Sequence, residues 1–238
     1  ARQKDKQPKP SNEFTIFGMP ILLKDNINAA GMPTTAGAVA LQKNMANNAF
    51  IVKQLQNKGA LILGKANLSE WAYFFCGDCP SGYSAMGGQT LNPYGRRIFD
   101  TGGSSSGSAV SVAANFCVAA VGSETSGSIL SPSSQNSVVG LKPTVGLLSR
   151  TGIVPISSTL DTAGPITKNV VDNAIMLDAL IGFDKEDSAS VKSEQESFSN
   201  LKNSSLKGKR FGVFKSLMAD SLYVEAISKL KNEGAEII

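Results

Sequence analysis

The chain has 238 residues, 42% of them hydrophobic and 18% charged, with a formal net charge of +4 and no histidine. This composition indicates a globular protein with a sizeable core and excludes disordered, collagen-like and disulfide-framework classes. Its basic residues are scattered, so we expect no nucleic-acid partner. The longest apolar stretch, residues 109–121, falls short of the roughly 20 residues of a membrane helix, so we expect no membrane partner.

The termini and the cysteines indicate a compartment. No apolar segment follows the charged first ten residues, so the chain shows no signal peptide and the cytoplasm is the default expectation. Three cysteines, Cys76, Cys79 and Cys117, are too few and odd in number for a disulfide framework, which favours a reducing compartment. Without histidine the chain cannot itself supply a Ser-His-Asp triad or a His-ligated metal site. We expect neither a metal nor a cofactor.

Helical and extended patterns alternate along the chain. A helix-glycine-strand pattern occurs near each end, with Gly59 or Gly234 ending the helix. The pattern predicts helices over 49–58, 104–116, 170–182 and 221–233, and strands over 60–65, 117–122, 138–142, 210–215 and 235–238. This order predicts an α/β fold, a mixed sheet covered by helices on both faces.

The domain organisation follows from the same pattern. We expect one domain over residues 1–238, with the polar, Ser-, Lys- and Glu-rich segment 184–209 as a surface excursion within it. The final strand, 235–238, stops where a strand would normally lead onward. The chain is therefore expected to be a fragment, incomplete at both ends.

Two segments, 100–109 and 122–129, are unusually rich in glycine and serine. Such composition normally indicates a linker, but the core-like run between them favours a packed region. Glycine-rich turns after strands expose backbone N–H groups that can bind a phosphate or a developing oxyanion. Neither GxGxxG nor GxxxxGK[ST] occurs, so we favour the oxyanion.

The remaining catalytic patterns leave lysine as the candidate base. GxSxG occurs at 103–107, but its triad needs histidine, and SxxK occurs at 199–202 and 204–207 only within the polar segment. Lys24 follows the apolar run at 21–23, where burial would lower its pKa from about 10.4 toward the ~7–8 that a base needs. On this segment alone, a lysine reaching out from a strand end is the competing interpretation.

Three separated blocks carry a resemblance to a known family. GMPILLKDNI, GGSSSGS and GSETSGSI, the last followed by VVGLKPT, resemble the amidase signature family of serine hydrolases in order and spacing. The resemblance extends from about Phe17 through LKGKRFGV, and ILGKANLSEWA and GLKPTVGLLSRTGIVPIS are most similar to the peptide amidases. It implies hydrolysis of a carboxamide C–N bond in a peptide amide or other small amide.

The resemblance also implies roles for individual residues. Ser128 would be the nucleophile that forms an acyl-enzyme, Ser104 the serine on a cis peptide bond that relays its proton, and Lys24 the base. The implied oxyanion hole consists of the backbone N–H groups of Thr125, Ser126, Gly127 and Ser128. Ser105 would be a supporting hydrogen-bond partner.

Some positions depart from the family or allow other interpretations. Leu130 stands where many members have arginine, which argues against the A-type component of a glutamyl-tRNA amidotransferase. That component remains one alternative, and an inactive, truncated homologue is the other. For Cys76 and Cys79 we favour a structural or incidental role over a redox pair or half a zinc site.

Three further positions have structural interpretations. We expect Trp71 in the core. Asn67 and Glu70 predict a capping box that begins a helix. Asp161, in STLDTAGP, is expected to stabilise a turn and to take no part in catalysis.

Overall fold

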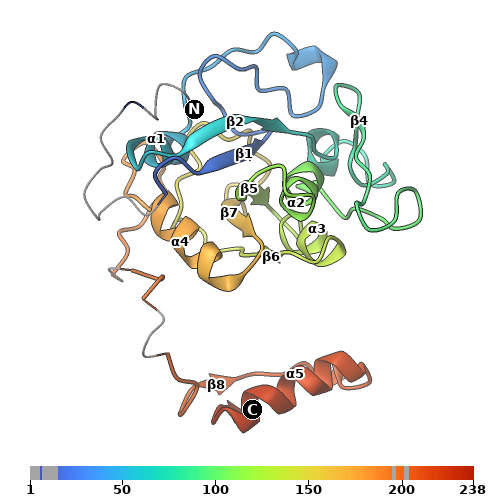
Figure 1. Ribbon diagram of the computed structural model, residues 1–238, viewed down its shortest axis with the longest axis vertical. Helices are drawn as coiled ribbons and strands as arrows, with labels where there is room; N and C mark the ends of the chain where they lie inside the picture. Colours follow the sequence, from blue (N-terminus) through green and yellow to red (C-terminus); the bar gives the residue numbers. More distant parts are fainter. Residues whose placement is uncertain (1–5, 7–15, 195–196, 201–203) are drawn as a thin grey trace. The chain divides into compact units, whose positions relative to one another are not determined.

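The computed structural model describes residue 6 and residues 16–194, 197–200 and 204–238. The chain divides into two compact units, residues 1–199 and 200–238, and each is described by itself. Figure 1 shows the first unit as a layered α/β structure and the second as a helix with short strands beside it. None of the helices in the described ranges is long and apolar enough to cross a bilayer.

The first unit contains a central sheet with helices packed on it. Its strands are β1 (Pro20–Lys24), β2 (Leu61–Ala66), β3 (Tyr83–Ser84), β4 (Gly88–Gln89), β5 (Ala119–Glu124), β6 (Val139–Gly140) and β7 (Thr162–Thr167). Its helices are α1 (Phe50–Asn57), α2 (Ser106–Ala113), α3 (Leu130–Gln135) and α4 (Val170–Leu180), with 3-10 turns η1 (Val39–Leu41) and η2 (Glu70–Tyr73).

The central sheet is mixed, as predicted. Its strand order is β2-β1-β5-β7-β6, with β1 parallel to both neighbours and β7 antiparallel to both of its neighbours. The parallel strands β1 and β5 lie side by side, so their carboxyl ends open onto the same edge of the sheet. Lys24 ends β1 and Glu124 ends β5. The glycine- and serine-rich segment 100–109 runs into the first turn of α2, and the segment 122–129 begins in β5 and ends just before α3.

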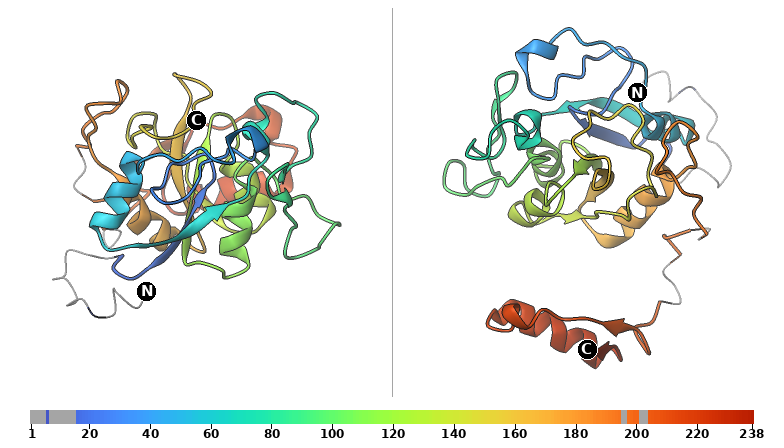
Figure 2. Two further views of the ribbon diagram at one scale, coloured as in Figure 1. Left: turned by 90° about the horizontal axis from the view of Figure 1, so that it is seen from above. Right: turned by 180° about the vertical axis from the view of Figure 1, so that it is seen from behind.

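Helices cover both faces of this sheet, which confirms the predicted architecture (Figures 1 and 2). Because side chains alternate along a strand, Leu23 of β1 packs into one core with α1 and α4. Ala120 of β5 and Ile166 of β7 pack into a second core with Val112 of α2. Burial of these apolar side chains stabilises the sheet that positions Lys24.

The second unit contains β8 (Arg210–Phe211), η3 (Lys215–Leu217), α5 (Ser221–Asn232) and β9 (Glu236–Ile237). Strands β8 and β9 pair in parallel, as a β-α-β connection requires. The Asp220 carboxylate caps α5 by accepting hydrogen bonds from the N–H groups of Leu222 (2.8 Å) and Tyr223 (3.1 Å). The predicted helix over 221–233 and its following strand are confirmed, whereas the strand predicted over 210–215 ends at Phe211.

Among the elements of the first unit that the sequence did not predict, β7 and α3 contain residues that disfavour their structure. Strand β7 contains Gly164 and Pro165, which are both poor strand formers, and tertiary packing overrides that local preference because all six of its residues are buried. Helix α3 contains Pro132, which is tolerated because it lies in the first turn, where its missing N–H has no helical partner.

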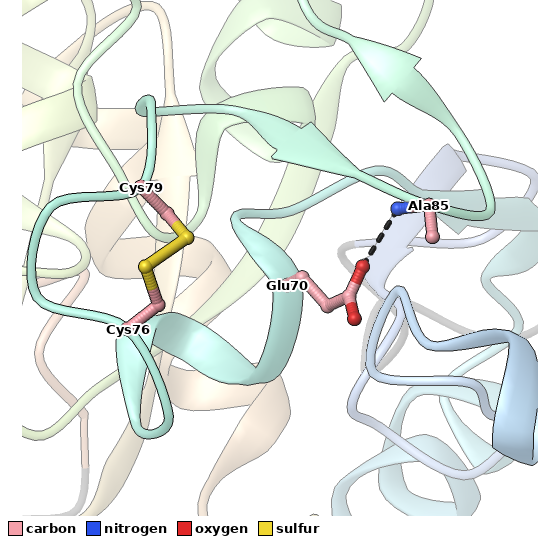
Figure 3. Close-up of a disulfide and its surroundings, with 4 residues drawn as sticks. All are labelled: Glu70, Cys76, Cys79 and Ala85. Carbon is pink, nitrogen blue, oxygen red and sulfur yellow. Dashed lines mark hydrogen bonds between the residues drawn. A yellow bond between two sulfur atoms is a disulfide. The ribbon is translucent and has the colours of Figure 1, made fainter.

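The segment 71–79 differs from its predictions. Cys76 and Cys79 are joined by a disulfide, a local staple over four residues, so the inference that these thiols stay reduced is not supported (Figure 3). Cys117 is free and buried. Trp71 is only half-buried and so is not a core residue.

The predicted capping box at Asn67 and Glu70 is wrong. The Glu70 carboxylate accepts a hydrogen bond from the backbone N–H of Ala85 (2.7 Å), as Figure 3 shows. The Asn67 side chain donates to the carbonyl of Gly88 (3.0 Å). Both side chains therefore bind the 82–90 loop instead of a helix terminus.

The polar segment 184–209 includes positions 195–196 and 201–203, which lie outside the described residues. Its described residues form no helix or strand. Asp184 and Asp187 are nevertheless buried, and their carboxylates bind Ser149 and Arg150 of the first unit. This stretch is therefore attached to the sheet-containing unit at least as far as Asp187.

Candidate active site

Lys24 lies at the carboxyl end of a central strand and is fully buried. Its Nζ donates hydrogen bonds to Ser104 Oγ (2.7 Å) and to the carbonyl oxygen of Ser123 (3.0 Å). The apolar residues before it hold β1 between β2 and β5, so this lysine ends an interior strand of the packed sheet. The interpretation of Lys24 as an exposed strand-end lysine is therefore wrong.

Burial changes the acid–base chemistry of this lysine. Loss of hydration disfavours the ammonium form and lowers the pKa of Lys24 from 10.5 to about 7, although the negative charges of Glu124 and Asp161 oppose the shift. A pKa near 7 makes a substantial fraction of the amine neutral at neutral pH. Lys24 can therefore accept a proton as a general base.

Ser104 follows a cis peptide bond between Gly103 and Ser104, where the resemblance placed one. Its side chain is fully buried and accepts the hydrogen bond from Lys24. The carbonyl oxygen of Ser104 accepts a hydrogen bond from the N–H of Ser69 (3.1 Å), which fixes the backbone on its other side. The Ser104 hydroxyl is thus held against a lysine of lowered pKa.

Gly103 has no room for a side chain. A Cβ at this position would overlap the Tyr73 hydroxyl and Ser69 Oγ, so we expect Gly103→Ala to displace the Ser104 backbone and to destabilise the chain by about 1–3 kcal/mol. Denaturant unfolding would measure this cost. Gly77→Ala is the control, because a Cβ there has no neighbour within 4 Å. Equal stability of the two variants would contradict the prediction.

Ser105 joins the segments that carry the other two serines. Its backbone N–H donates to the carbonyl oxygen of Ser128 (3.1 Å), and its Oγ donates to the carbonyl oxygen of Ser123 (3.1 Å). These bonds bring Ser128 into the neighbourhood of Ser104. Among the described residues, no hydrogen bond joins the Ser104 and Ser128 hydroxyls directly.

The turn 125–128 follows β5 and leads into α3. Gly127 has a φ of +79°, which favours glycine, and Ser128 is 7% exposed. The Glu124 carboxylate accepts hydrogen bonds from the N–H groups of Ile129 (2.7 Å) and Leu130 (3.0 Å), which fixes the end of the turn. The backbone N–H groups of 125–128 donate to no acceptor within the described ranges, so they are free to bind a developing oxyanion.

Asp161 stabilises a turn, as expected, and also contacts the candidate site. Its Oδ2 accepts hydrogen bonds from the N–H groups of Ile156 (2.7 Å) and Ser157 (2.9 Å). Its Oδ1 accepts one from Thr125 Oγ1 (2.6 Å). The carboxylate therefore ties the start of the turn 125–128 to the loop around Ile156.

A cavity of about 330 Å³ opens beside this turn. Thr125 lines the cavity, whereas Lys24, Ser104 and Ser128 do not. Its volume is at the lower end of the range typical of small-molecule sites. Its wall also includes acidic groups at Glu124 and Asp161.

Sequence reasoning missed three residues of this arrangement. Asn26 Nδ2 donates to Ser123 Oγ (2.8 Å), Ser123 supplies the carbonyl that binds Lys24, and Glu124 binds the turn's last N–H groups. All three lie within the blocks GMPILLKDNI and GSETSGSI, so these blocks were the sequence signal that could have identified them. Across the described chain, no group of three or more Cys, Asp or Glu residues is arranged to hold a metal ion.

The amidase family model matches residues 1–238. The chain belongs to the amidase family. It is 48% identical over 231 residues to a probable amidase of Arabidopsis thaliana, covering 94% of this chain and 44% of that protein. It is 40% identical to the A component of the glutamyl-tRNA(Gln) amidotransferase of Lawsonia intracellularis, and the match covers 98% of this chain and 48% of that protein.

Solved structures agree with this assignment. The native peptide amidase of Stenotrophomonas maltophilia superposes with a TM-score of 0.86 at 47% identity, covering 93% of this chain and 47% of that one. The chain thus spans about half the length of the relatives it matches. The amidase-signature fold predicted from the three sequence blocks is confirmed.

Proposed function

We propose that the protein hydrolyses the C–N bond of a peptide amide or other small carboxamide through an acyl-enzyme on Ser128. The hydrogen bond from Lys24, with its lowered pKa, to Ser104 carries this proposal. Neutral Lys24 accepts the Ser104 proton while Ser104 accepts that of Ser128, whose Oγ attacks the amide carbonyl carbon. The Lys24–Ser104 geometry supports the base and relay roles.

The later steps use the same groups. The N–H groups of 125–128 stabilise the tetrahedral oxyanion, and removing one such donor typically costs about 2.7–4 kcal/mol. The proton held on Lys24 returns through Ser104 to the departing amine, which breaks the C–N bond. Water then hydrolyses the Ser128 ester and restores the three groups.

Two alternatives to this function remain. The A components of glutamyl-tRNA(Gln) amidotransferases are among the relatives, which supports such a role here, whereas Leu130 disfavours it. The other alternative is an inactive homologue of the amidase family. We favour hydrolysis, because the peptide amidase structure is similar at higher identity than the amidotransferase component.

Labelling by a fluorophosphonate probe tests the assignment of the nucleophile. We expect covalent modification at Ser128, located by peptide mass mapping, because a serine activated by a base reacts with such probes. Labelling should be abolished in Ser128→Ala and at least about 100-fold slower in Ser104→Ala and Lys24→Ala, because general-base assistance is typically worth 10²–10⁴-fold.

The pH dependence provides the second part of this test. With the pKa of Lys24 near 7, the labelling rate should rise with pH through about 7 and level off above it. Ser199→Ala is the control, because this serine belongs to an SxxK pattern that we assign no catalytic role. Absence of labelling in a folded chain would favour the inactive homologue.

A further inference from the structure

A second, smaller cavity of about 100 Å³ shares a wall with the larger one. The shared wall consists of Asn26 and the segment 154–156. Apart from Asn26, every residue that lines the smaller cavity is apolar. Its aromatic members are Trp71, Phe74 and Phe75.

The aromatic side chains form one cluster. The Phe75 ring packs edge-on against Trp71 (centroids 5.4 Å apart) and against Phe74 (5.0 Å). Phe74 is 59% exposed and Phe75 is 71% exposed, although both line a concave surface. Apolar surface of this kind, in a hollow beside a polar cavity, is typical of a ligand site.

The backbone that carries the cluster is strained. Trp71, Ala72 and Tyr73 have φ values of 50°, 52° and 70°, in the left-handed region that bulky residues rarely adopt. Consecutive residues of this kind persist only where their surroundings hold them, and they gather at functional sites. Here the Trp71 N–H donates to the Ala36 carbonyl (2.8 Å) and the Tyr73 hydroxyl donates to Ser81 Oγ (2.7 Å).

The smaller cavity is connected to the candidate active site on two sides. Ser69, just before the strained turn, donates its N–H to the carbonyl of Ser104. On the other side, the Asn26 carbonyl accepts a hydrogen bond from the Val154 N–H (2.9 Å) and its Nδ2 donates to Ser123 Oγ. A group bound between Trp71 and Ile156 would therefore lie beside the segments that hold Ser104 and Lys24.

We propose that this cavity is a subsite for an apolar, aliphatic side chain on the acyl part of the substrate. The proposal rests on the proposed amidase function and specifies its substrate class. The volume sets the size, because a dry cavity of roughly 150 Å³ takes benzene. At about 100 Å³, the cavity suits a side chain of leucine size better than a large aromatic one.

Binding can be measured without catalysis, because Trp71 is the single tryptophan of the chain. We would titrate Ser128→Ala protein with N-acetyl-leucinamide and with N-acetylglycinamide and follow the tryptophan emission. We expect the leucine amide to bind at least about tenfold more tightly, since each methylene buried in an apolar site contributes roughly 0.8 kcal/mol, or about fourfold. In Phe75→Ala the ratio should fall below about threefold.

Phe116→Ala provides the matched control. Phe116 is 70% exposed, like Phe75, but lines neither cavity, so its removal should leave the tenfold ratio unchanged. Equal binding of the two amides, no emission change with either, or an unchanged ratio in Phe75→Ala would overturn the subsite.

Ammonia release by the unmodified chain tests the amidase function separately. Selective binding without hydrolysis would retain the subsite and reject the proposed function. Hydrolysis without selective binding would retain the proposed function and reject the subsite.

Discussion

Replacing Lys24 with methionine should make the chain more stable at pH 7 while slowing labelling at Ser128 at least about 100-fold. The buried amine has a pKa of about 7 in the folded chain and an ordinary value of 10.5 when exposed. A shift of this size corresponds to about 4 kcal/mol of lost stability at pH 7. Methionine removes that cost but also two hydrogen bonds of about 1 kcal/mol each, so we expect a net gain of about 2 kcal/mol.

The gain has a defined pH window. Between about 7 and 10.5 the unfolded chain binds a proton at Lys24 that the folded chain does not, so the stability of the unmodified protein rises with pH across this interval. The stability lost by burying the Lys24 amine is fully present below pH 7 and disappears near pH 10.5. The difference between Lys24→Met and the unmodified chain should therefore shrink with pH, reverse near pH 9, and above about pH 10.5 reflect only the lost hydrogen bonds.

Urea unfolding at several pH values would measure this difference. Lys65→Met is the contrasting variant, because Lys65 is largely buried but pairs with Asp25 (2.7 Å). Removing Lys65 leaves a carboxylate without its cation, so this variant should lose stability at pH 7. A loss of stability in Lys24→Met at pH 7, comparable with that of Lys65→Met, would show that Lys24 is charged in the folded chain.

How far the sequence predicts this molecule depends on which interactions are local. The helix-glycine-strand units at Gly59 and Gly234 were predictable because periodicity and a terminating glycine act over a few residues. Strand β7 was not, because its Gly164 and Pro165 are extended through pairing with β5, which is distant in sequence.

The candidate site shows the same division. Lys24, Ser104 and Ser128 were found through family blocks, and Lys24 alone also fitted the chemistry of a buried base. The strained turn at Trp71 had no sequence signal, because bulky residues in left-handed conformations are set by tertiary contacts. The disulfide between Cys76 and Cys79 is local, but the residue count argued against it.

The second large effect is expected at Arg150, which holds the buried carboxylate of Asp187 at the rim of the larger cavity. Arg150 donates to both Asp187 oxygens, from Nη2 to Oδ1 (2.6 Å) and from Nε to Oδ2 (3.0 Å). The Asp187 side chain is 4% exposed. The arginine, more than any other partner, lowers the pKa of Asp187 to about 2.

Arg150→Met should therefore destabilise the chain by about 3 kcal/mol at pH 7, because it leaves a buried carboxylate without its cation. The stability that Asp187 contributes is present above its ordinary pKa of 3.8 and is lost as pH falls through about 2. Without Arg150 that pKa should rise. The destabilisation should accordingly be largest at neutral pH and should diminish as Asp187 becomes protonated on acidification.

Denaturant unfolding at pH 7 and pH 4 would measure the loss of stability in Arg150→Met and its decrease on acidification. Arg210→Met is the control. Arg210 pairs with Glu236 at 3.7 Å, but the two side chains are 64% and 59% exposed, so this change should cost less than about 1 kcal/mol. The double variant Arg150→Met/Asp187→Asn should recover part of the loss, because a neutral amide needs no cation. A cost for Arg150→Met as small as that for Arg210→Met would mean that water reaches Asp187, and that the wall of the cavity is more open than these contacts indicate.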